Sequence, residues 1–526
     1  MMNTIDPTPT PGVLTAADPA REPLVLVTAE EAYPELENAL LDARHSFVAG
    51  FRIFDLSTRL RGARARAVGA DWFDLILDAL QRGVSVRIVL SDFDPVVGED
   101  LHAGTWRTLR LAAALAELAP DGAKLSVQAA QHPARLAWPV RLALWPKVQK
   151  MLGERAAEMR RMTGPERQQV LRDRPGLWDM FHLDGEAIRP RRFRLPDLKP
   201  VTHHQKIAVI DGEVVYCGGL DLDDRRFDTK RHEQSAEQTW HDVQVLVRDF
   251  ALAEAATDHL DRFVRICAAT EEPSPGPSGL LRTLSARSLW RLFAPNTIVA
   301  ELEQAILNGI GTARRHIYLE SQFLRDRRIA RALRQAARRV PDLTLLLVLP
   351  AAPDDVAFEN NTGSDARFGE FLQARRVRGV RRAFGSRCLI ASPVRPVASR
   401  SSGRDSIYGS PQIYVHAKVC IFDDRLAIIS SANLNGRSMR WDTEAGIALS
   451  VPSQVRGVHR RLLSHWLEGA EIKADPLDLS IDDWRRIARE NARLPAEKRQ
   501  GFLVPYLETP ARKFGADLPG LPEELV

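Results

Sequence analysis

The stretch YVHAKVCIFDD, residues 414–424, carries a histidine and a lysine two residues apart at the start of a strand-like apolar run, which ends on acidic residues. Residues 202–212 read THHQKIAVIDG, which is nearly the same pattern, and the two copies align without a gap at a constant offset of 212 residues. At this offset His204, Lys206 and Asp211 match His416, Lys418 and Asp423. The repetition predicts a chain built from two related halves.

Strand geometry indicates which side chains of each copy act together. Residues i and i+2 of a strand lie on one face, so each histidine shares a face with the lysine of its own copy. Asp211 and Asp423 fall at the opposite parity, at the end of the apolar run, and we interpret them as structural residues of the motif. Asp211-Gly212 is a strong signal for a two-residue hairpin turn.

The segment after each hairpin strand supplies small residues. A two-residue turn would place Gly219 across from His204 and Ser431 across from His416. Small side chains there would leave space above each imidazole for a phosphate group, which backbone N–H groups could help to bind. Asn433 follows Ser431 closely and is predicted to bind the same phosphate.

The paired residues have a consistent interpretation in phosphodiester chemistry. A neutral imidazole can attack phosphorus and form a covalent phospho-histidine. A second, protonated imidazole can donate its proton to the leaving alcohol, and the ordinary pKa of histidine suits both roles. Two lysines and an asparagine supply positive charge and donors where negative charge accumulates on the phosphoryl oxygens. This chemistry requires no metal and no cofactor, and we predict none.

The two motifs resemble those of the phospholipase D superfamily. HxKxxxxD occurs twice, followed by GGLDL (218–222) in one copy and SSANLNGRS (430–438) in the other. WHDV (240–243), DTE (442–444) and IYLESQFL (317–324) also resemble segments of this family, and the resemblance spans roughly residues 24–470. Among its members, WHD and RSMRWDTE are most similar to the phosphatidylcholine-type phospholipases D.

The resemblance implies a role for each matching residue. His204 would be the nucleophile and His416 the general acid, although the symmetry makes the two roles nearly interchangeable. Asp242 would orient His204, and Glu444, or with less weight Asp442, would orient His416. Lys206, Lys418 and Asn433 would bind the phosphate, whereas Asp221, which stands where the second copy has Asn433, is expected to point elsewhere. Calcium dependence is not implied.

The order of elements predicts an α/β fold of two tandem sandwich halves, each a mixed sheet flanked by helices, related by pseudo-two-fold symmetry. We predict a disordered leader at 1–22 and an N-terminal catalytic half at 23–270 with an insertion at about 96–200. A linker at 271–285, marked by PSPGPSG, would lead to a C-terminal half at 286–471 and a tail at 472–526. Both halves would form one site, so we expect a monomer.

Composition restricts the class of protein. The chain has 526 residues, of which 44% are hydrophobic and 27% charged, with a net charge of +5. No apolar run is long enough for a membrane span and the N-terminus lacks the pattern of a Sec signal peptide, so we expect a cytoplasmic or peripheral membrane location, with export by another route left open. The four scattered cysteines predict neither a disulfide framework nor a zinc site.

Four functions are compatible with the motifs. The first is hydrolysis of a glycerophospholipid such as phosphatidylcholine at a membrane surface, with possible transfer of the phosphatidyl group to another alcohol. The second is a phosphatidyltransferase of the cardiolipin-synthase kind, although those proteins often carry N-terminal membrane helices. The third is a nuclease, disfavoured because no dense basic stripe with aromatic residues is present, so no stable nucleic acid partner is expected. The fourth, a non-catalytic module, would predict erosion of one motif.

Residues 132–150, HPARLAWPVRLALWPKVQK, mix tryptophan, leucine and basic side chains. They could form an interfacial helix on an anionic membrane. We favour a helical cap packed on the core, because Pro133, Pro139 and Pro146 should interrupt any long helix.

Overall fold

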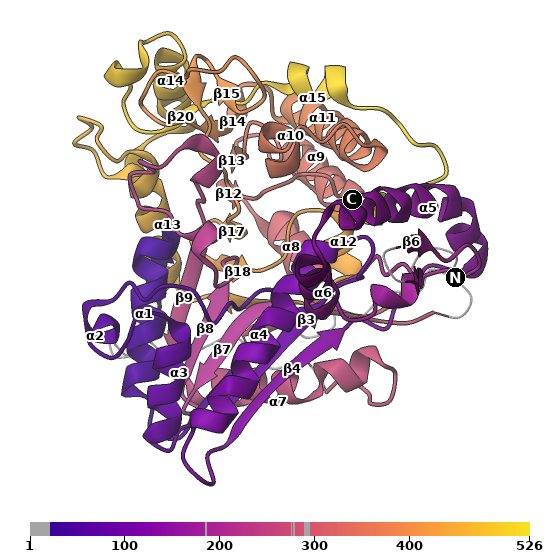
Figure 1. The fold of residues 1–526 in the computed structure, drawn as a ribbon. Helices are drawn as coiled ribbons and strands as arrows, with labels where there is room; N and C mark the ends of the chain where they lie inside the picture. Colours follow the sequence, from indigo (N-terminus) through magenta and orange to yellow (C-terminus); the bar gives the residue numbers. More distant parts are fainter. Residues whose placement is uncertain (1–21, 185–186, 275, 277–278, 289–294) are drawn as a thin grey trace, which may run out of the picture.

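The computed structural model describes residues 22–184, 187–274, 276, 279–288 and 295–526. They form two mixed β-sheets flanked by helices (Figure 1), which confirms the predicted α/β class. The first sheet has the strand order β1-β9-β8-β7-β2-β3-β4, and the second has the order β11-β10-β19-β18-β17-β12-β13-β14-β20. Nearly all of the predicted leader lies outside the described residues.

The strands of the two sheets come from opposite halves of the chain. The first sheet contains β1 (Leu24–Val27), β2 (Ser46–Phe51), β3 (Ser85–Asp92), β4 (Leu125–Gln131), β7 (Lys206–Ile210), β8 (Val214–Gly218) and β9 (Val243–Arg248). The second contains β10 (Leu280–Ala286), β11 (Asn296–Ala300), β12 (His316–Glu320), β13 (Thr344–Val348), β14 (Cys388–Pro393), β17 (Val419–Phe422), β18 (Leu426–Ser430), β19 (Glu444–Leu449) and β20 (Leu503–Pro505).

Six strands of each sheet repeat one topology. The order β9-β8-β7-β2-β3-β4 in the first sheet corresponds to β19-β18-β17-β12-β13-β14 in the second. In both, the motif strand (β7 or β17) is antiparallel to its two neighbours, and the two outer pairs beyond it are parallel. The two tandem halves therefore share both motif and topology.

Three apolar cores hold these layers together. One packs sheet 1 against α1 (Thr28–Asp42), α3 (Trp72–Gln81) and α4 (Glu99–Leu118). Another packs sheet 2 against α8 (Glu301–Thr312), α9 (Arg327–Arg339) and α11 (Ser364–Phe384). The third is shared: it combines residues of both sheets with α7 (Phe250–Cys267) and α13 (Pro452–Trp466). This shared core fixes the two halves face to face.

The segment without a counterpart in the repeat is shorter than the predicted insertion at about 96–200. Strand β4 pairs in parallel with β3, as β14 pairs with β13, so residues up to Gln131 belong to the repeated core. Beyond it come α5 (Trp138–Arg161), α6 (Gly164–Asp173) and a separate hairpin of β5 (Phe181–Asp184) and β6 (Ala187–Pro190). We call residues 132–200 the insertion from here on.

Two predicted boundaries also differ. Residues 280–285 were assigned to the linker, but they lie in β10, which pairs with β19 of the second sheet. Residues 472–526 were assigned to a tail, but their strand β20 pairs with β14, and α14 (Ile481–Asn491) and α15 (Glu508–Phe514) pack on the same half. These residues therefore complete the second half of the molecule.

Helix α5 is continuous from Trp138 to Arg161, so the prolines do not interrupt it as predicted. Pro139 lies in the first turn, where a backbone N–H has no acceptor within the helix, so the missing N–H costs no hydrogen bond. Pro146 lies inside the helix and leaves the carbonyl of Leu142 without its helical donor. Leu142 is largely exposed, so water can take the place of that donor.

The aspartate of each motif fastens its hairpin to the neighbouring strand. Asp211 accepts hydrogen bonds from the backbone N–H groups of Arg44, His45 and Ser46, each 2.8 Å long. Asp423 accepts three in the same way from residues 314–316, at 2.8–3.0 Å. Although burial opposes ionisation, these donors hold the pKa of both carboxyls below the ordinary value.

Replacing Asp423 by alanine should therefore lower the free energy of unfolding by about 2–3 kcal/mol, because three backbone donors lose a charged acceptor. The pKa is lowered in the folded state, so this contribution is full above the unfolded pKa and declines as the pH falls through the folded value. Denaturant unfolding at several pH values measures it. Asp424→Ala, which removes only an exposed ion pair with Arg315, is the control; an equal loss in both variants would contradict the account.

Candidate active site

The two motifs meet where the halves join. His204 and His416 stand just before β7 and β17, and the segments that carry them pair with the opposite half. The N–H of His204 donates to the carbonyl of Thr443 (2.8 Å), and the N–H of His416 donates to the carbonyl of His241 (2.8 Å). Backbone pairing thus places each histidine beside the acidic segment of the other half.

The carboxylates consequently contact the histidines in a crossed arrangement. Nδ1 of His204 lies 3.1 Å from Oε2 of Glu444, and Nδ1 of His416 lies 2.6 Å from Oδ2 of Asp242. The predicted pairs, Asp242 with His204 and Glu444 with His416, are therefore wrong. The error follows from assigning each acid to the motif that precedes it, because the pairing of strand ends runs between the halves. Asp442 binds Arg437 and the N–H of Thr202 instead.

The two motif lysines are buried beside their histidines. Nζ of Lys206 donates to the carbonyl of His204 (2.6 Å), and Lys418 contacts the carbonyl of His416 in the same way. Lys206 also lies 3.7 Å from Oδ2 of Asp221. Asp221 thus neutralises part of the charge of Lys206, which explains how an acid can occupy the position that matches Asn433.

Gly219 and Ser431 do not lie opposite the motif histidines as predicted. Three residues connect each hairpin, since Ile210 pairs with Val214 and Phe422 pairs with Leu426, and the register moves by one. The longer connection accompanies the left-handed backbone of the motif aspartates, whose φ angles are 54° and 51°. The prediction assumed a two-residue turn, and it therefore placed Gly219 and Ser431 one residue out of register.

Gly219 and Ser431 instead contact the carboxylates. A Cβ at Gly219 would lie 2.2 Å from Oδ1 of Asp242, so only glycine lets Asp242 approach so closely. The hydroxyl of Ser431 donates to Oε2 of Glu444. Equivalent positions of the two halves therefore support the two acids by different means.

Asn433 lies in the same region and keeps a free polar atom. Its side chain is buried, and its Oδ1 has no hydrogen-bond partner among the described residues. Buried polar groups are normally paired, so a buried amide oxygen without a partner, two residues after the Ser431 that binds Glu444, is expected of a group that binds a ligand.

Burial dominates the electrostatics of the site. It holds the pKa of His204 well below the ordinary value, with Lys206 and Arg52 acting in the same direction. Burial raises the pKa of Glu444 to about 8, although Lys206 opposes the shift. Burial also lowers the pKa of Lys418 to about 7, against the attraction of Asp242. Shifted values of this kind are typical of catalytic sites.

Sequence reasoning missed Arg52 and Trp240. Arg52 follows β2 and is close enough to lower the pKa of both His204 and Lys206. The bridge of Phe54 with Leu222 corresponds to that of Leu324 with Leu434, so the counterpart of Arg52 in the repeat is Gln322. This correspondence is the sequence signal that could have identified Arg52. The ring of Trp240 lies against the ring of His416, with centroids 4.6 Å apart. The guanidinium carbon of Arg226 lies 4.4 Å from the centroid of the Trp240 ring.

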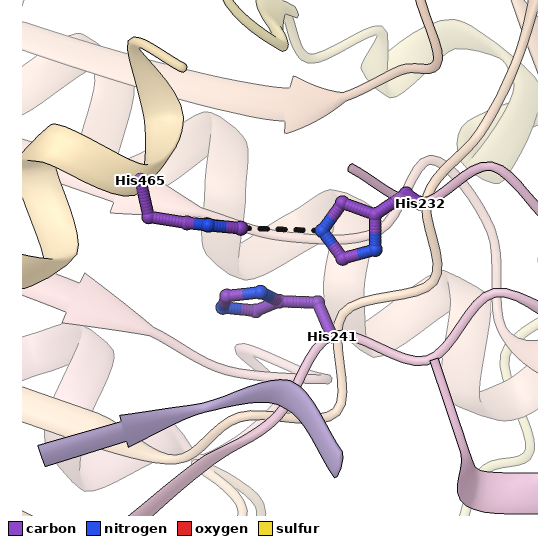
Figure 2. A group of neighbouring side chains, drawn as sticks. All are labelled: His232, His241 and His465. Carbon is purple, nitrogen blue, oxygen red and sulfur yellow. Dashed lines mark hydrogen bonds between the residues drawn. The ribbon is translucent and has the colours of Figure 1, made fainter. Parts of the chain in front are cut away.

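Figure 2 shows a second group of histidines, which adjoins the site through His241, the residue before Asp242. His232, His241 and His465 are buried, and their nitrogens fall within 4.8 Å of one another. The rings of His241 and His465 are nearly parallel, with centroids 4.9 Å apart and planes at 21°, so their lone pairs do not converge on one point. Such stacking does not suit coordination of a metal, whose imidazole ligands direct their nitrogens at it.

This cluster instead ties the halves together. Nδ1 of His232 binds Asp228 (2.6 Å), Nε2 of His241 binds Glu320 (2.9 Å), and Nε2 of His232 lies 3.2 Å from Nε2 of His465. Because Asp242 is adjacent to His241, this network positions the acid that contacts His416.

Known proteins resemble both the sequence and the fold. The family described as "Cardiolipin synthase, PLD-like domain" matches residues 306–466. The chain is 21% identical over 328 residues to phospholipase D A of Dictyostelium discoideum, covering 51% of this chain and 26% of that protein. It is 21% identical over 280 residues to cardiolipin synthase 1 of Bacillus anthracis, covering 52% and 48%. The chain belongs to the phospholipase D superfamily.

A solved structure supports the fold of this superfamily member. Phosphatidylserine synthase from Haemophilus influenzae Rd KW20 superposes with a TM-score of 0.50 at 11% identity, covering 84% of this chain and 86% of that one. The chain spans about a quarter of the length of the Dictyostelium phospholipase and about half that of the Bacillus synthase. No helix within the described ranges has the length and apolarity that a membrane span requires.

Gly219→Ala provides a test of the crossed arrangement. The new Cβ should displace Asp242 from His416, and we expect turnover of a phosphodiester substrate to fall about 100-fold, as it does when a catalytic group is misplaced by about 1 Å. Steady-state kinetics and a thermal melt measure activity and folding together.

Gly104→Ala is the matched control, because a Cβ there meets nothing within 4 Å. Full activity of a folded Gly219→Ala protein would show that the contact between Asp242 and His416 does not matter for turnover.

Proposed function

We propose that the protein is a phospholipase D-type phosphodiesterase. It would hydrolyse a glycerophospholipid such as phosphatidylcholine to phosphatidate and the head-group alcohol, through a phospho-histidine intermediate. The observation that carries the proposal is the placement of two histidines, each held at Nδ1 by a carboxyl group of the opposite half, beside two buried lysines. One chain supplies both motifs, so the active form would be a monomer.

His204 is proposed as the nucleophile. Oε2 of Glu444 accepts a hydrogen bond from Ser431, so the same oxygen is suited to accept from Nδ1 of His204. The proton then resides on Nδ1, and Nε2 keeps its lone pair for attack on phosphorus. With its pKa near 8, Glu444 is largely protonated at neutral pH and gives little stabilisation to an imidazolium, which keeps His204 neutral.

His416 is proposed as the general acid. Its Nδ1 lies 2.6 Å from Oδ2 of Asp242. Burial raises the pKa of Asp242, and the ammonium of Lys418 beside this acid opposes the shift. Burial and the neighbouring Lys418 hold the pKa of His416 well below its ordinary value in the free protein. An anionic phosphodiester beside the ring would raise this pKa and favour the imidazolium that the general acid requires. His416 would protonate the leaving alcohol and then, as a neutral base, take a proton from the incoming water.

The phosphate would be bound by Lys206, Lys418 and Asn433. Both lysines are buried, so their attraction for phosphoryl oxygens is weakened little by water. The amide of Asn433 has a free atom and can reorient to donate its N–H groups. These groups would stabilise negative charge that grows in the transition state.

A phosphatidyltransferase of the cardiolipin-synthase kind is the second candidate. The match of residues 306–466 to a family of that description and the similarity to the Bacillus synthase favour it. Both activities pass through the same phosphatidyl-histidine, and they differ in whether water or a lipid alcohol receives the phosphatidyl group. The choice of acceptor therefore separates the two.

The test incubates the purified protein with phosphatidylcholine vesicles containing 1-butanol, and measures phosphatidate, choline and phosphatidylbutanol. We expect all three products, and we expect His204→Ala and His416→Ala each to lower turnover at least about 1000-fold, because nucleophilic and acid–base catalysis are both lost. Phosphatidylglycerol vesicles, assayed for cardiolipin, test the second candidate.

The nucleophile is identified by trapping. A His416 variant that attacks but releases product slowly should accumulate lipid phosphate on His204, detectable by peptide mass spectrometry after rapid quenching. Label on His416 in a His204 variant would reverse the two assignments. Absence of turnover with every common phospholipid would overturn the lipase proposal.

A further inference from the structure

The insertion exposes an unusual set of apolar side chains. Among the residues that the structure describes, sixteen large hydrophobic ones are exposed; six of them lie within residues 132–200, and these six include three of the four aromatic ones. They are Trp138, Leu142, Leu144, Trp178, Leu183 and Phe193. Phe193 is fully exposed, and Trp138 is 65% exposed. Exposed aromatic residues in one segment indicate a surface that another apolar phase covers.

Hydrogen bonds place several of these side chains in one neighbourhood. The side chain of Gln149 donates to the carbonyl of Arg191 (3.3 Å), and Arg141 binds Asp197 (2.9 Å), so residues 191–197 run beside α5 in the opposite direction. Phe193 therefore lies along the first half of α5.

Trp178 joins the same surface. Arg194 binds Asp179 at 2.9 Å, and the N–H of Arg191 donates to the carbonyl of Met180 at 2.8 Å. Residues 178–180, which include Trp178, therefore run beside residues 191–194, which include Phe193. Trp138 and Leu142 follow one another by a single turn on α5, whereas the later part of the helix packs inward through Val148 and Leu152. We call Trp138, Leu142, Trp178 and Phe193 the apolar patch.

Basic residues outnumber acidic ones in the two segments that carry Trp138, Leu142 and Phe193. From residue 122 to residue 153 the chain has five basic side chains and no acidic one, and residues 187–200 add five basic side chains against one acid. Tryptophan and phenylalanine with neighbouring arginine and lysine are the composition of segments that lie in the interface of an anionic bilayer. The charge therefore favours an anionic phospholipid surface as the occupant.

The position of the insertion connects this surface to the active site. Ala134, near the start of the insertion, and Val201, directly after its end, pack with Trp441. Trp441 lies next to Asp442, which accepts from the N–H of Thr202 at 2.8 Å, two residues before His204. Figure 1 shows α5 and β6 at the periphery, to one side of both sheets.

We propose that the apolar patch and the basic side chains of segments 122–153 and 187–200 dock the protein on an anionic phospholipid surface and hold the active site at that surface. The proposal rests on the proposed lipid phosphodiesterase function, which it supplies with a means of reaching lipid in a bilayer.

The test measures binding without turnover. Full-length protein carrying His204→Ala is sedimented with phosphatidylcholine vesicles, with and without phosphatidylglycerol, at low and high salt. We expect stronger binding to the anionic vesicles and weaker binding at high salt. Phe193→Asp and Trp138→Ala should each lower the partition coefficient at least about tenfold, because each removes an aromatic group from the interface.

Phe250→Asp is the matched control, since Phe250 on α7 is as exposed as Trp138 and lies outside the insertion. It should leave binding unchanged. The proposal is overturned if Phe193→Asp and Trp138→Ala bind vesicles as the parent does, or if Phe250→Asp weakens binding equally.

Activity assays separate this proposal from the catalytic one. In the active protein, Phe193→Asp should slow hydrolysis of vesicles but not of short-chain phosphatidylcholine below its micellar concentration. Equal losses on both substrates would place Phe193 at the site and refute docking. If no phospholipid is turned over at all, the proposed function fails, and the sedimentation result still decides whether the apolar patch binds membranes.

Discussion

The crossed contact between each motif histidine and a carboxyl group of the other half is the constraint on which the structure depends. His204 faces Glu444 and His416 faces Asp242, so neither half contains a complete pair. The bridges of His203 with Thr443 and of His241 with Val415 set these contacts through the backbone. The halves must therefore pack face to face, which explains why their largest apolar core draws on both sheets.

The two half-sites have diverged in compensating ways. Aspartate is shorter than glutamate by one methylene group. Asp242 still reaches His416 because Gly219 has no Cβ, which would lie only 2.2 Å from Oδ1 of Asp242. Glu444 needs no such approach, and the corresponding Ser431 adds a hydroxyl that binds it. In each half, the length of the acidic side chain is thus matched by the size of the small residue that it contacts.

The features that depend on residues close together in the sequence could be predicted from the sequence alone. The α/β class, the two halves and the motif residues follow from short-range patterns that occur twice. The crossed pairs could not be predicted in this way, because residues 204 and 444 meet only when the sheets pack. The hairpin register was missed because Asp211 and Asp423 reach backbone donors of another strand, which lengthens the connection. Pro146 did not end α5, because Leu142, whose carbonyl it leaves without a helical donor, lies at an exposed position where water can bind.

Charge balance explains why such a site favours a phosphodiester. Lys206 and Lys418 are buried and Arg52 is half-buried beside them, and burying cations costs free energy unless negative charge compensates them. Asp221 and Asp242 supply part of this compensation, but Glu444, with its pKa raised to about 8, contributes little at neutral pH. Burial lowers the pKa of Lys418 to about 7 even though Asp242 attracts its charge, so this compensation is incomplete. An anionic phosphate group between the two histidines would restore the balance, so binding the substrate and retaining the charge of the lysines favour each other.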